Sequence, residues 1–217
     1  MSTDLGATLS FVTTGTKLCA DAVAGLDEAG FAAPSALPGW TRKHLVTHLA
    51  ANAEALLRLL HWATTGERTP MYSSPEQRNA DIEAGAQRPG TDLARWFTTS
   101  AARLDEALTA MPADAWAAEV VTAQGRTVPA SEIPWMRARE VLVHAVDLAT
   151  GVTFADLPDA FLSALGDEIR AKRAAAGEQV DGLVGSLPAV TAHLAGRGTS
   201  GVTTQDGAPA RAPSPWL

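Results

Sequence analysis

The segment Met136-Arg-Ala-Arg-Glu-Val-Leu-Val-His-Ala-Val-Asp-Leu148 decides how the fold of this chain is interpreted. It lacks glycine and proline, and Gly151 follows it as a plausible helix stop. As a helix it would be apolar on nearly every side, which is typical of a buried helix. Glu140 and His144 would nevertheless share one face, four residues apart, with Asp147 three residues further on. A buried carboxylate is costly unless it is paired or binds a cation, so a metal would account for this pattern.

Two residues alone do not establish a metal site. A glutamate and a histidine at this spacing can hydrogen-bond to each other inside a helical core, and such a match is weak evidence. The helix expected at residues 41–64 offers three candidates for a third ligand: His44, His48 and His61. His61 would lie near an exposed helix end, whereas His48 would lie mid-helix among apolar residues. Its mid-helix position favours His48, and spacing leaves His44 open.

The composition is typical of a folded globular protein. Of the 217 residues, 46% are apolar and 19% charged, which is not the signature of a disordered chain. The 17 basic and 24 acidic residues give a formal charge of -7, which argues against a nucleic-acid partner because such partners need a clustered basic face. No apolar run approaches the roughly 18 residues of a membrane span, and the first residues lack a basic signal-peptide region. We expect a cytoplasmic protein with no membrane partner.

Cys19 is the single cysteine, so the chain forms no intramolecular disulfide. It lies in a segment with helical character, where a small buried thiol is the usual arrangement. A nucleophilic thiolate would need an activating cation close to the sulfur, and none is evident from the sequence. Any thiol chemistry would therefore have to come from a cosubstrate.

The periodicity of apolar residues predicts four long helices, at residues 4–28, 41–64, 91–111 and 136–148. A long connection at 66–90 holds a short helix near 76–86, and residues 119–128 alternate weakly around Gly125, as in a small hairpin. These elements predict a four-helix bundle, whose core is a common place for metal ligands from facing helices. After Gly151 the composition shifts, with helices expected near 156–173 and 188–195 and a strand at 201–204.

Several long segments resemble the mycothiol-dependent maleylpyruvate isomerases, a family of DinB-like bundle proteins. The matching segments are Gly39–His48, Thr69–Tyr72, Thr122–Ser131 and Arg139–Leu148, and the resemblance resumes at Ala195–Gly198. It runs from about residue 36 to 150 without obvious gaps. This resemblance implies a mainly α fold, with a DinB-like four-helix bundle at residues 1–152 and a small C-terminal α/β domain at 153–217 that closes over the site.

The same resemblance implies the site residues. Zinc would be held by His48, Glu140 and His144, and mycothiol would be the thiol cosubstrate. Arg78 and Arg197 match the two active-site arginines of the family, although a lone surface arginine is usually only solvated. If both bind one dicarboxylate, the substrate would lie between the two domains. We expect a monomer whose only partners are these small molecules.

Two features depart from the family pattern. Only Ala174–Val184 spans a connection that is usually longer and carries a strand, so the C-terminal domain is predicted to be shortened. The tail also lacks the arginine that usually precedes the final tryptophan, here Trp216. Neither departure touches the predicted zinc ligands.

The function that this resemblance implies is the cis–trans isomerisation of maleylpyruvate to fumarylpyruvate by thiol addition, bond rotation and elimination. The alternative within the same fold is a mycothiol S-transferase that acts on another electrophile. A zinc-dependent hydrolase would need a separate general base, for which Asp147 is the sole candidate. A structural metal in a non-catalytic bundle is a third class, but structural zinc usually has four protein ligands. Dependence of turnover on a thiol separates the first two classes from the others.

Overall fold

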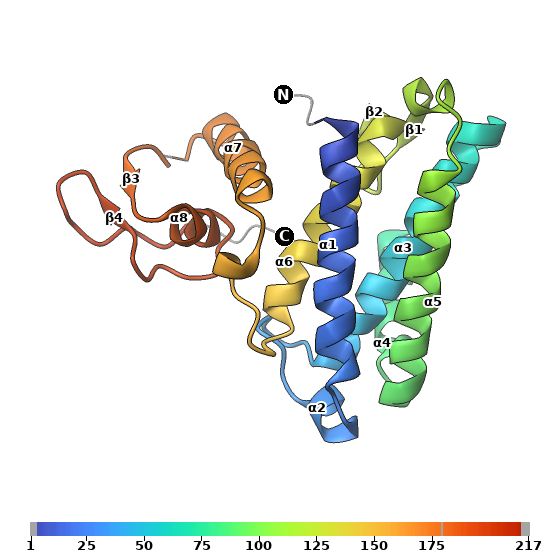
Figure 1. Ribbon diagram of the computed structural model, residues 1–217, viewed down its shortest axis with the longest axis horizontal. Helices are drawn as coiled ribbons and strands as arrows, with labels where there is room; N and C mark the ends of the chain where they lie inside the picture. Colours follow the sequence, from blue (N-terminus) through green and yellow to red (C-terminus); the bar gives the residue numbers. More distant parts are fainter. Residues whose placement is uncertain (1–3, 179, 214–217) are drawn as a thin grey trace. The chain divides into compact units, whose positions relative to one another are not determined.

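The computed structural model describes residues 4–178 and 180–213, and the chain divides into two compact units, Met1–Gly151 and Val152–Leu217. The first unit contains four long helices that pack side by side: α1 (Leu5–Ala24), α3 (Arg42–Thr65), α5 (Gly90–Thr109) and α6 (Ile133–Asp147) (Figure 1). The second unit combines two helices with a two-stranded sheet. The predicted fold class, a helical bundle followed by a small α/β part, is confirmed.

Helix α3 has clear sequence signals at both ends. Thr41 is its N-cap, and the His44 ring accepts from the Thr41 backbone at 3.2 Å in a reciprocal capping arrangement. Gly66 ends the helix in the left-handed conformation, with φ of 77°, which glycine adopts without strain. The buried face of α3 is formed by Leu45, Val46, Leu49, Leu56, Leu59 and Leu60. Burying each such side chain contributes about 1.5 to 3 kcal/mol, so this face anchors α3 in the bundle.

Helix α6 is largely buried, as its sequence predicts. Val141, Leu142 and Val143 are all fully buried, because neighbouring helices cover successive faces. Helix α1 approaches α6 closely at Gly15, where an added Cβ would lie 2.5 Å from a methyl group of Val141. A side chain larger than hydrogen at this position would force the two helices apart.

The C-terminal end of α6 is held against the start of α3 by one side chain. Arg42 donates from Nε to the Leu148 carbonyl at 2.6 Å and from Nη2 to the Ala149 carbonyl at 2.9 Å. Its Nη1 donates to the carbonyl of Gly30 at 3.1 Å. A guanidinium on the last carbonyls of a helix satisfies acceptors that have no helical partner and complements the helix dipole. This contact fixes the register between the two helices that carry the predicted ligands.

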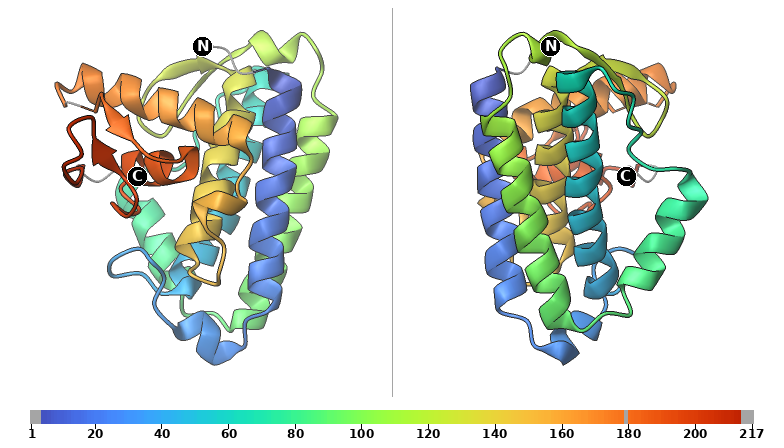
Figure 2. Two further views of the ribbon diagram at one scale, coloured as in Figure 1. Left: turned by 60° about the vertical axis from the view of Figure 1, so that its left-hand side comes forward. Right: turned by 90° about the vertical axis from the view of Figure 1, so that its right-hand side faces the viewer.

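The remaining elements of the first unit lie around the bundle. They are α2 (Glu28–Ala32), α4 (Pro75–Gly85), the short 3-10 turns Ala115–Ala117 and Ala130–Glu132, and the antiparallel strands β1 (Glu119–Val121) and β2 (Thr127–Pro129). Helix α4 lies beside α3, outside the four long helices (Figure 2). The predicted hairpin is confirmed, with Val120 opposite Val128.

Two helix boundaries differ from the prediction. Residues 4–28 do not form one helix, because α1 ends at Ala24 and Asp27 caps the separate helix α2 with its own side chain. Helix α5 begins at Gly90 after Pro89, slightly earlier than the expected start at residue 91. An added Cβ on Gly90 would lie 2.3 Å from the Phe31 ring, so the first residue of α5 packs closely against α2.

The second unit has its own small core. It contains the 3-10 turn Phe154–Asp156, α7 (Asp159–Ala175), β3 (Leu183–Val184), α8 (Leu187–Leu194) and β4 (Thr203–Thr204). The two strands pair antiparallel, with Leu183 opposite Thr204. Arg173 is buried and donates to the carbonyl of Leu194 from Nε and Nη2, which ties α7 to the end of α8. The predicted difference at Trp216 lies outside the described residues.

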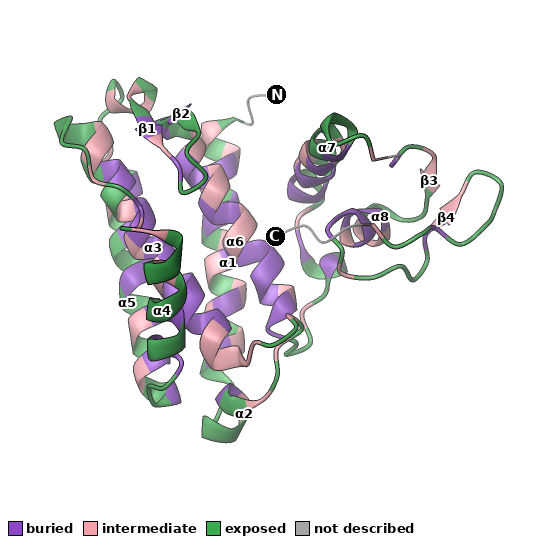
Figure 3. Ribbon diagram, turned by 180° about the vertical axis from the view of Figure 1, so that it is seen from behind, coloured by how far each residue is buried: buried purple, intermediate pink, exposed green. Residues whose placement is uncertain are grey.

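The inward faces of the four long helices are buried, whereas α4 is largely exposed (Figure 3). No helix within the described part of the chain combines the length and the apolar character that crossing a bilayer requires.

Candidate metal centre

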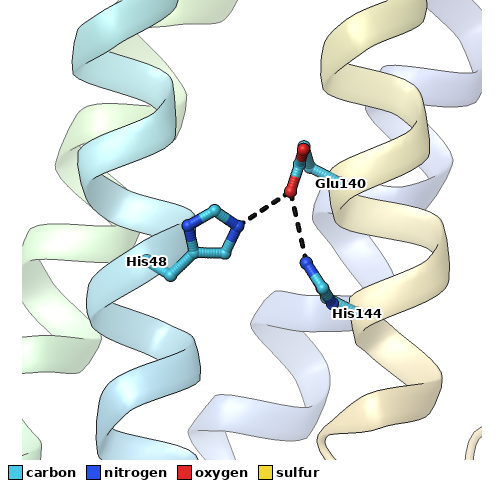
Figure 4. A group of neighbouring side chains, drawn as sticks. All are labelled: His48, Glu140 and His144. Atoms are coloured by element: carbon cyan, nitrogen blue, oxygen red, sulfur yellow. Dashed lines mark hydrogen bonds and ion pairs between the residues drawn. The ribbon is translucent and has the colours of Figure 1, made fainter. Parts of the chain in front are cut away.

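Two facing helices bring three potential metal ligands together. His48 projects from α3 toward Glu140 and His144 on α6 (Figure 4), and one ligand atom from each residue lies within 4.8 Å of the others. The Oε2 atom of Glu140 is 2.8 Å from Nε2 of His48 and 3.2 Å from Nε2 of His144. The side chains of His48 and His144 are 7% and 6% exposed, whereas that of Glu140 is 19% exposed. The group is thus shielded by the bundle but still reached by solvent at the carboxylate.

The electrostatics of the group favour a charged carboxylate. Burial alone would raise the pKa of Glu140, but hydrogen bonds from His144 and His48 outweigh it and hold the pKa well below its usual value. Burial lowers the pKa of His48, opposed by its hydrogen bond to Glu140. Glu140 is therefore a carboxylate anion close to two imidazole rings. Its oxygen and the two imidazole nitrogens together form a suitable ligand set for a divalent cation.

Asp147 orients the second histidine. Its Oδ2 lies 2.8 Å from Nδ1 of His144, and its side chain is fully buried. Burial would lower the pKa of His144, yet its hydrogen bonds to Asp147 and Glu140 raise it to about 9. A carboxylate on Nδ1 fixes the ring orientation and leaves Nε2 facing the site, an arrangement usual around metal-binding histidines. A zinc-dependent hydrolase would need Asp147 as a free general base. Asp147 is instead hydrogen-bonded to the His144 ring, which it orients.

A fully buried guanidinium lies one helical turn from the group. Arg137 precedes Glu140 by three residues on α6, and its Nη1 donates to the carbonyl of Leu49 and to Oδ1 of Asn52, both at 2.8 Å. Burial lowers its pKa to about 10, so Arg137 remains charged at neutral pH. Sequence analysis missed this residue, because the segment alone does not show which face of α6 meets α3.

Helix α4 brings a second arginine to the group. Ser74 caps α4 with its side chain and Pro75 occupies the first turn, so the helix start is well defined by the sequence. Nη2 of Arg78, one turn into α4, lies 3.2 Å from Nδ1 of His48. The structure therefore places Arg78, predicted from the resemblance, directly beside one of the three candidate ligands.

The other candidates lie apart from the three-residue group. The His44 ring contacts the Thr41 hydroxyl at 2.7 Å and lies 3.4 Å from Glu83 on α4. His61 is half exposed at the far end of α3. The group of potential ligands thus contains His48 and neither of the other two histidines of α3.

Arg197 belongs to the second unit, where a turn after α8 displays it. Gly196 has a φ of 71°, and the Arg197 amide donates to the Ala192 carbonyl at 2.9 Å, which is a glycine-dependent helix ending. Its guanidinium donates to the carbonyl of Ala195 at 2.7 Å. The predicted role of Arg197 remains a proposal.

Cys19 is fully buried, and its thiol lies 3.1 Å from the Val141 carbonyl as a donor. Burial raises its pKa to about 12, so only about one molecule in ten thousand carries the thiolate at pH 8.

We expect the folded protein to resist alkylation by iodoacetamide at pH 8, and Cys19→Ser to retain turnover with a modest loss of stability. Mass spectrometry and steady-state kinetics measure both. Loss of turnover in a folded Cys19→Ser variant would indicate an internal nucleophile.

Comparison with known proteins identifies a family. Residues 12–149 match the family described as the mycothiol maleylpyruvate isomerase N-terminal domain. A crystal structure of the mycothiol-dependent maleylpyruvate isomerase is 41% identical, with a TM-score of 0.93 over 99% of this chain and 98% of that one. The structure of its variant with one histidine replaced by alanine gives 41% identity, a TM-score of 0.92 and the same coverage. A search among curated proteins gave no match. The chain belongs to the mycothiol maleylpyruvate isomerase family.

Proposed function

We propose that this protein catalyses the mycothiol-dependent cis–trans isomerisation of maleylpyruvate to fumarylpyruvate at a zinc ion held by His48, Glu140 and His144. The observation that carries the proposal is the group of three ligand atoms within 4.8 Å, shared by two helices of a chain that belongs to this family. Maleylpyruvate and mycothiol are the small-molecule partners.

The donor set fits zinc. Two imidazole nitrogens and one carboxylate oxygen are common zinc ligands, and three protein ligands leave one coordination position open for chemistry. Two neutral histidines and one carboxylate leave a net charge of about +1 on such a centre, which favours an anionic fourth ligand. When bound, zinc would supply a lowered thiol pKa, so that the cosubstrate reacts as a thiolate at neutral pH.

The chain itself supplies no thiol nucleophile, because its one thiol is buried and protonated. In the proposed reaction the mycothiol sulfur adds to one alkene carbon, and the alkene electron pair moves to the conjugated carbonyl oxygen as an enolate. The resulting single bond rotates. The enolate pair then returns, the carbon–sulfur bond breaks, and the alkene re-forms as the trans isomer with the thiolate released.

The two arginines are proposed to bind substrate carboxylates. A guanidinium binds a carboxylate through two parallel hydrogen bonds, and its fixed positive charge also stabilises the developing enolate. Support for Arg78 comes from its place on α4, 3.2 Å from His48. Support for Arg197 comes from the resemblance of its Gly196–Gly198 turn to the family.

The alternative S-transferase would use the same ligands and the same thiol, and only the electrophile would differ. The two carboxylate-binding arginines favour the isomerase, as does similarity to solved maleylpyruvate isomerases. We further propose that the protein acts as a monomer in the cytoplasm; sedimentation of the purified chain would measure the oligomeric state.

The decisive test follows maleylpyruvate by its absorbance with and without mycothiol. We expect turnover with mycothiol, and little without a thiol or with glutathione in its place. Equal rates with and without mycothiol would contradict the proposal and favour hydrolysis or another thiol-independent reaction. Conjugate formed in place of fumarylpyruvate, identified by chromatography, would instead support the S-transferase.

Asp147→Asn tests how much the buried carboxylate contributes to metal binding. The amide keeps the shape but not the charge of the group that orients His144, so we expect zinc affinity to fall by about ten- to a hundredfold. Competition with a chromophoric chelator measures this affinity. Asp156→Asn is a matched control, because Asp156 accepts hydrogen bonds from Thr153 in the second unit and should leave zinc affinity unchanged. Equal affinities of the two variants would contradict the orienting role.

A further inference from the structure

The connection between α3 and α4 carries the only tyrosine of the chain, Tyr72. This connection is pinned to α3 at Arg58, whose Nε donates to the Met71 carbonyl at 3.1 Å. The Thr69 hydroxyl donates to the Arg58 carbonyl at 2.9 Å, and Met71 is buried. Tyr72 is therefore displayed from a fixed piece of backbone, although it lies in a loop.

Tyr72 lies next to the candidate metal centre. The guanidinium carbon of Arg78 is 5.7 Å from the centre of the Tyr72 ring, and the same guanidinium is 3.2 Å from His48. The phenol also interacts electrostatically with Glu140 and with the buried Arg137. Arg78 thus connects the Tyr72 ring with the candidate ligand His48.

The hydroxyl can act as a hydrogen-bond donor. Burial raises the pKa of the Tyr72 phenol above its usual value, against the lowering effect of Arg78, so the group is protonated at neutral pH. Arginine offers no acceptor, and within residues 4–178 and 180–213 the structure assigns no acceptor to the phenol hydrogen. A half-buried donor beside the guanidinium group of Arg78 is suited to an oxygen anion that arrives with a ligand.

We propose that Tyr72 is a further catalytic residue, whose hydroxyl donates a hydrogen bond to the enolate oxygen of the substrate. This inference rests on the proposed function. When the thiolate adds to the alkene, negative charge moves to the carbonyl oxygen, and the hydrogen bond to that oxygen strengthens. The phenol keeps its proton throughout, so the electron pair returns to the carbon chain when the carbon–sulfur bond breaks. The donor stabilises the transition state more than the ground state, so it acts mainly on kcat.

Two variants separate the hydroxyl from the ring. Tyr72→Phe removes the hydroxyl, including its hydrogen bond with Arg78, and keeps the ring against Arg78, whereas Tyr72→Leu removes both hydroxyl and ring. We expect Tyr72→Phe to lower kcat by about ten- to a hundredfold, with a much smaller change in KM. Zinc content and Tm should equal those of the wild type, because no ligand and no buried apolar contact is lost. Tyr72→Leu should be at least as slow.

The outcomes distinguish this role from the proposed function. If Tyr72→Phe turns over like the wild type while Tyr72→Leu is slow, the ring merely positions Arg78 and the catalytic role is wrong. If both variants match the wild type, Tyr72 takes no part in the reaction. Absence of mycothiol-dependent turnover in the wild type would overturn the proposed function itself, and this role with it. A slow Tyr72→Phe with full zinc content supports both.

Discussion

His48→Ala should abolish both zinc binding and turnover while leaving the bundle folded. The variant removes one of three ligands and leaves Glu140 and His144 on a single helix, with no third donor from α3 in reach of them. Two ligands bind zinc far more weakly than three, so purified protein should fall from about one zinc per chain to a trace. Elemental analysis, circular dichroism and the maleylpyruvate assay measure the three properties.

His44→Ala is the matched control, because His44 lies one turn earlier on the same helix. Its ring contacts Thr41 and Glu83, so its loss should weaken the start of α3 and leave the zinc content unchanged. The opposite result, with zinc lost from His44→Ala and kept by His48→Ala, would show that the ligand assignment is wrong.

The largest kinetic effect should come from removing both arginines. Arg78→Lys keeps the charge but loses the planar pair of donors, and Arg197→Ala loses both. A charge-assisted hydrogen bond contributes about 1.5 to 3 kcal/mol, so each variant should lower kcat/KM by about one to two powers of ten. If both arginines act on one transition state, their effects should not be additive. The change in activation free energy in the double variant should then differ from the sum of the changes in the two single variants. A kinetic double-mutant cycle, with zinc measured in every variant, tests this coupling.

Arg68→Lys is the control for the arginine chemistry. Arg68 stacks on Trp62 at 5.8 Å, nearly the same cation–π distance as that between Arg78 and Tyr72. It is exposed and should leave kcat/KM unchanged when replaced by lysine. Wild-type kinetics of Arg197→Ala would restrict that residue to a structural role, and the proposed site would then contain Arg78 alone.

Local sequence patterns determined most of the helical framework and two of the three candidate ligands. The apolar character of residues 136–148 on nearly every side indicates a buried helix, and Glu140 and His144 share a face because they are four residues apart. Caps such as Thr41 and Gly66 are local hydrogen-bond and backbone effects, so they can be recognised without the fold. They are less exact at α5, which begins at Gly90 and not at residue 91.

Only the tertiary structure decided which turn of α3 meets α6. His44 and His48 lie on one face of α3, so periodicity cannot separate them. Which of the two faces Glu140 depends on how far α3 and α6 are shifted along their axes relative to each other. That shift is set by contacts between residues far apart in the chain, among them the Arg42 hydrogen bonds to the end of α6. The neighbours of the site depend on the same long-range packing. Tyr72, Arg78 and Arg137 reach it from three different segments, and no local pattern marks any of them as adjacent to Glu140.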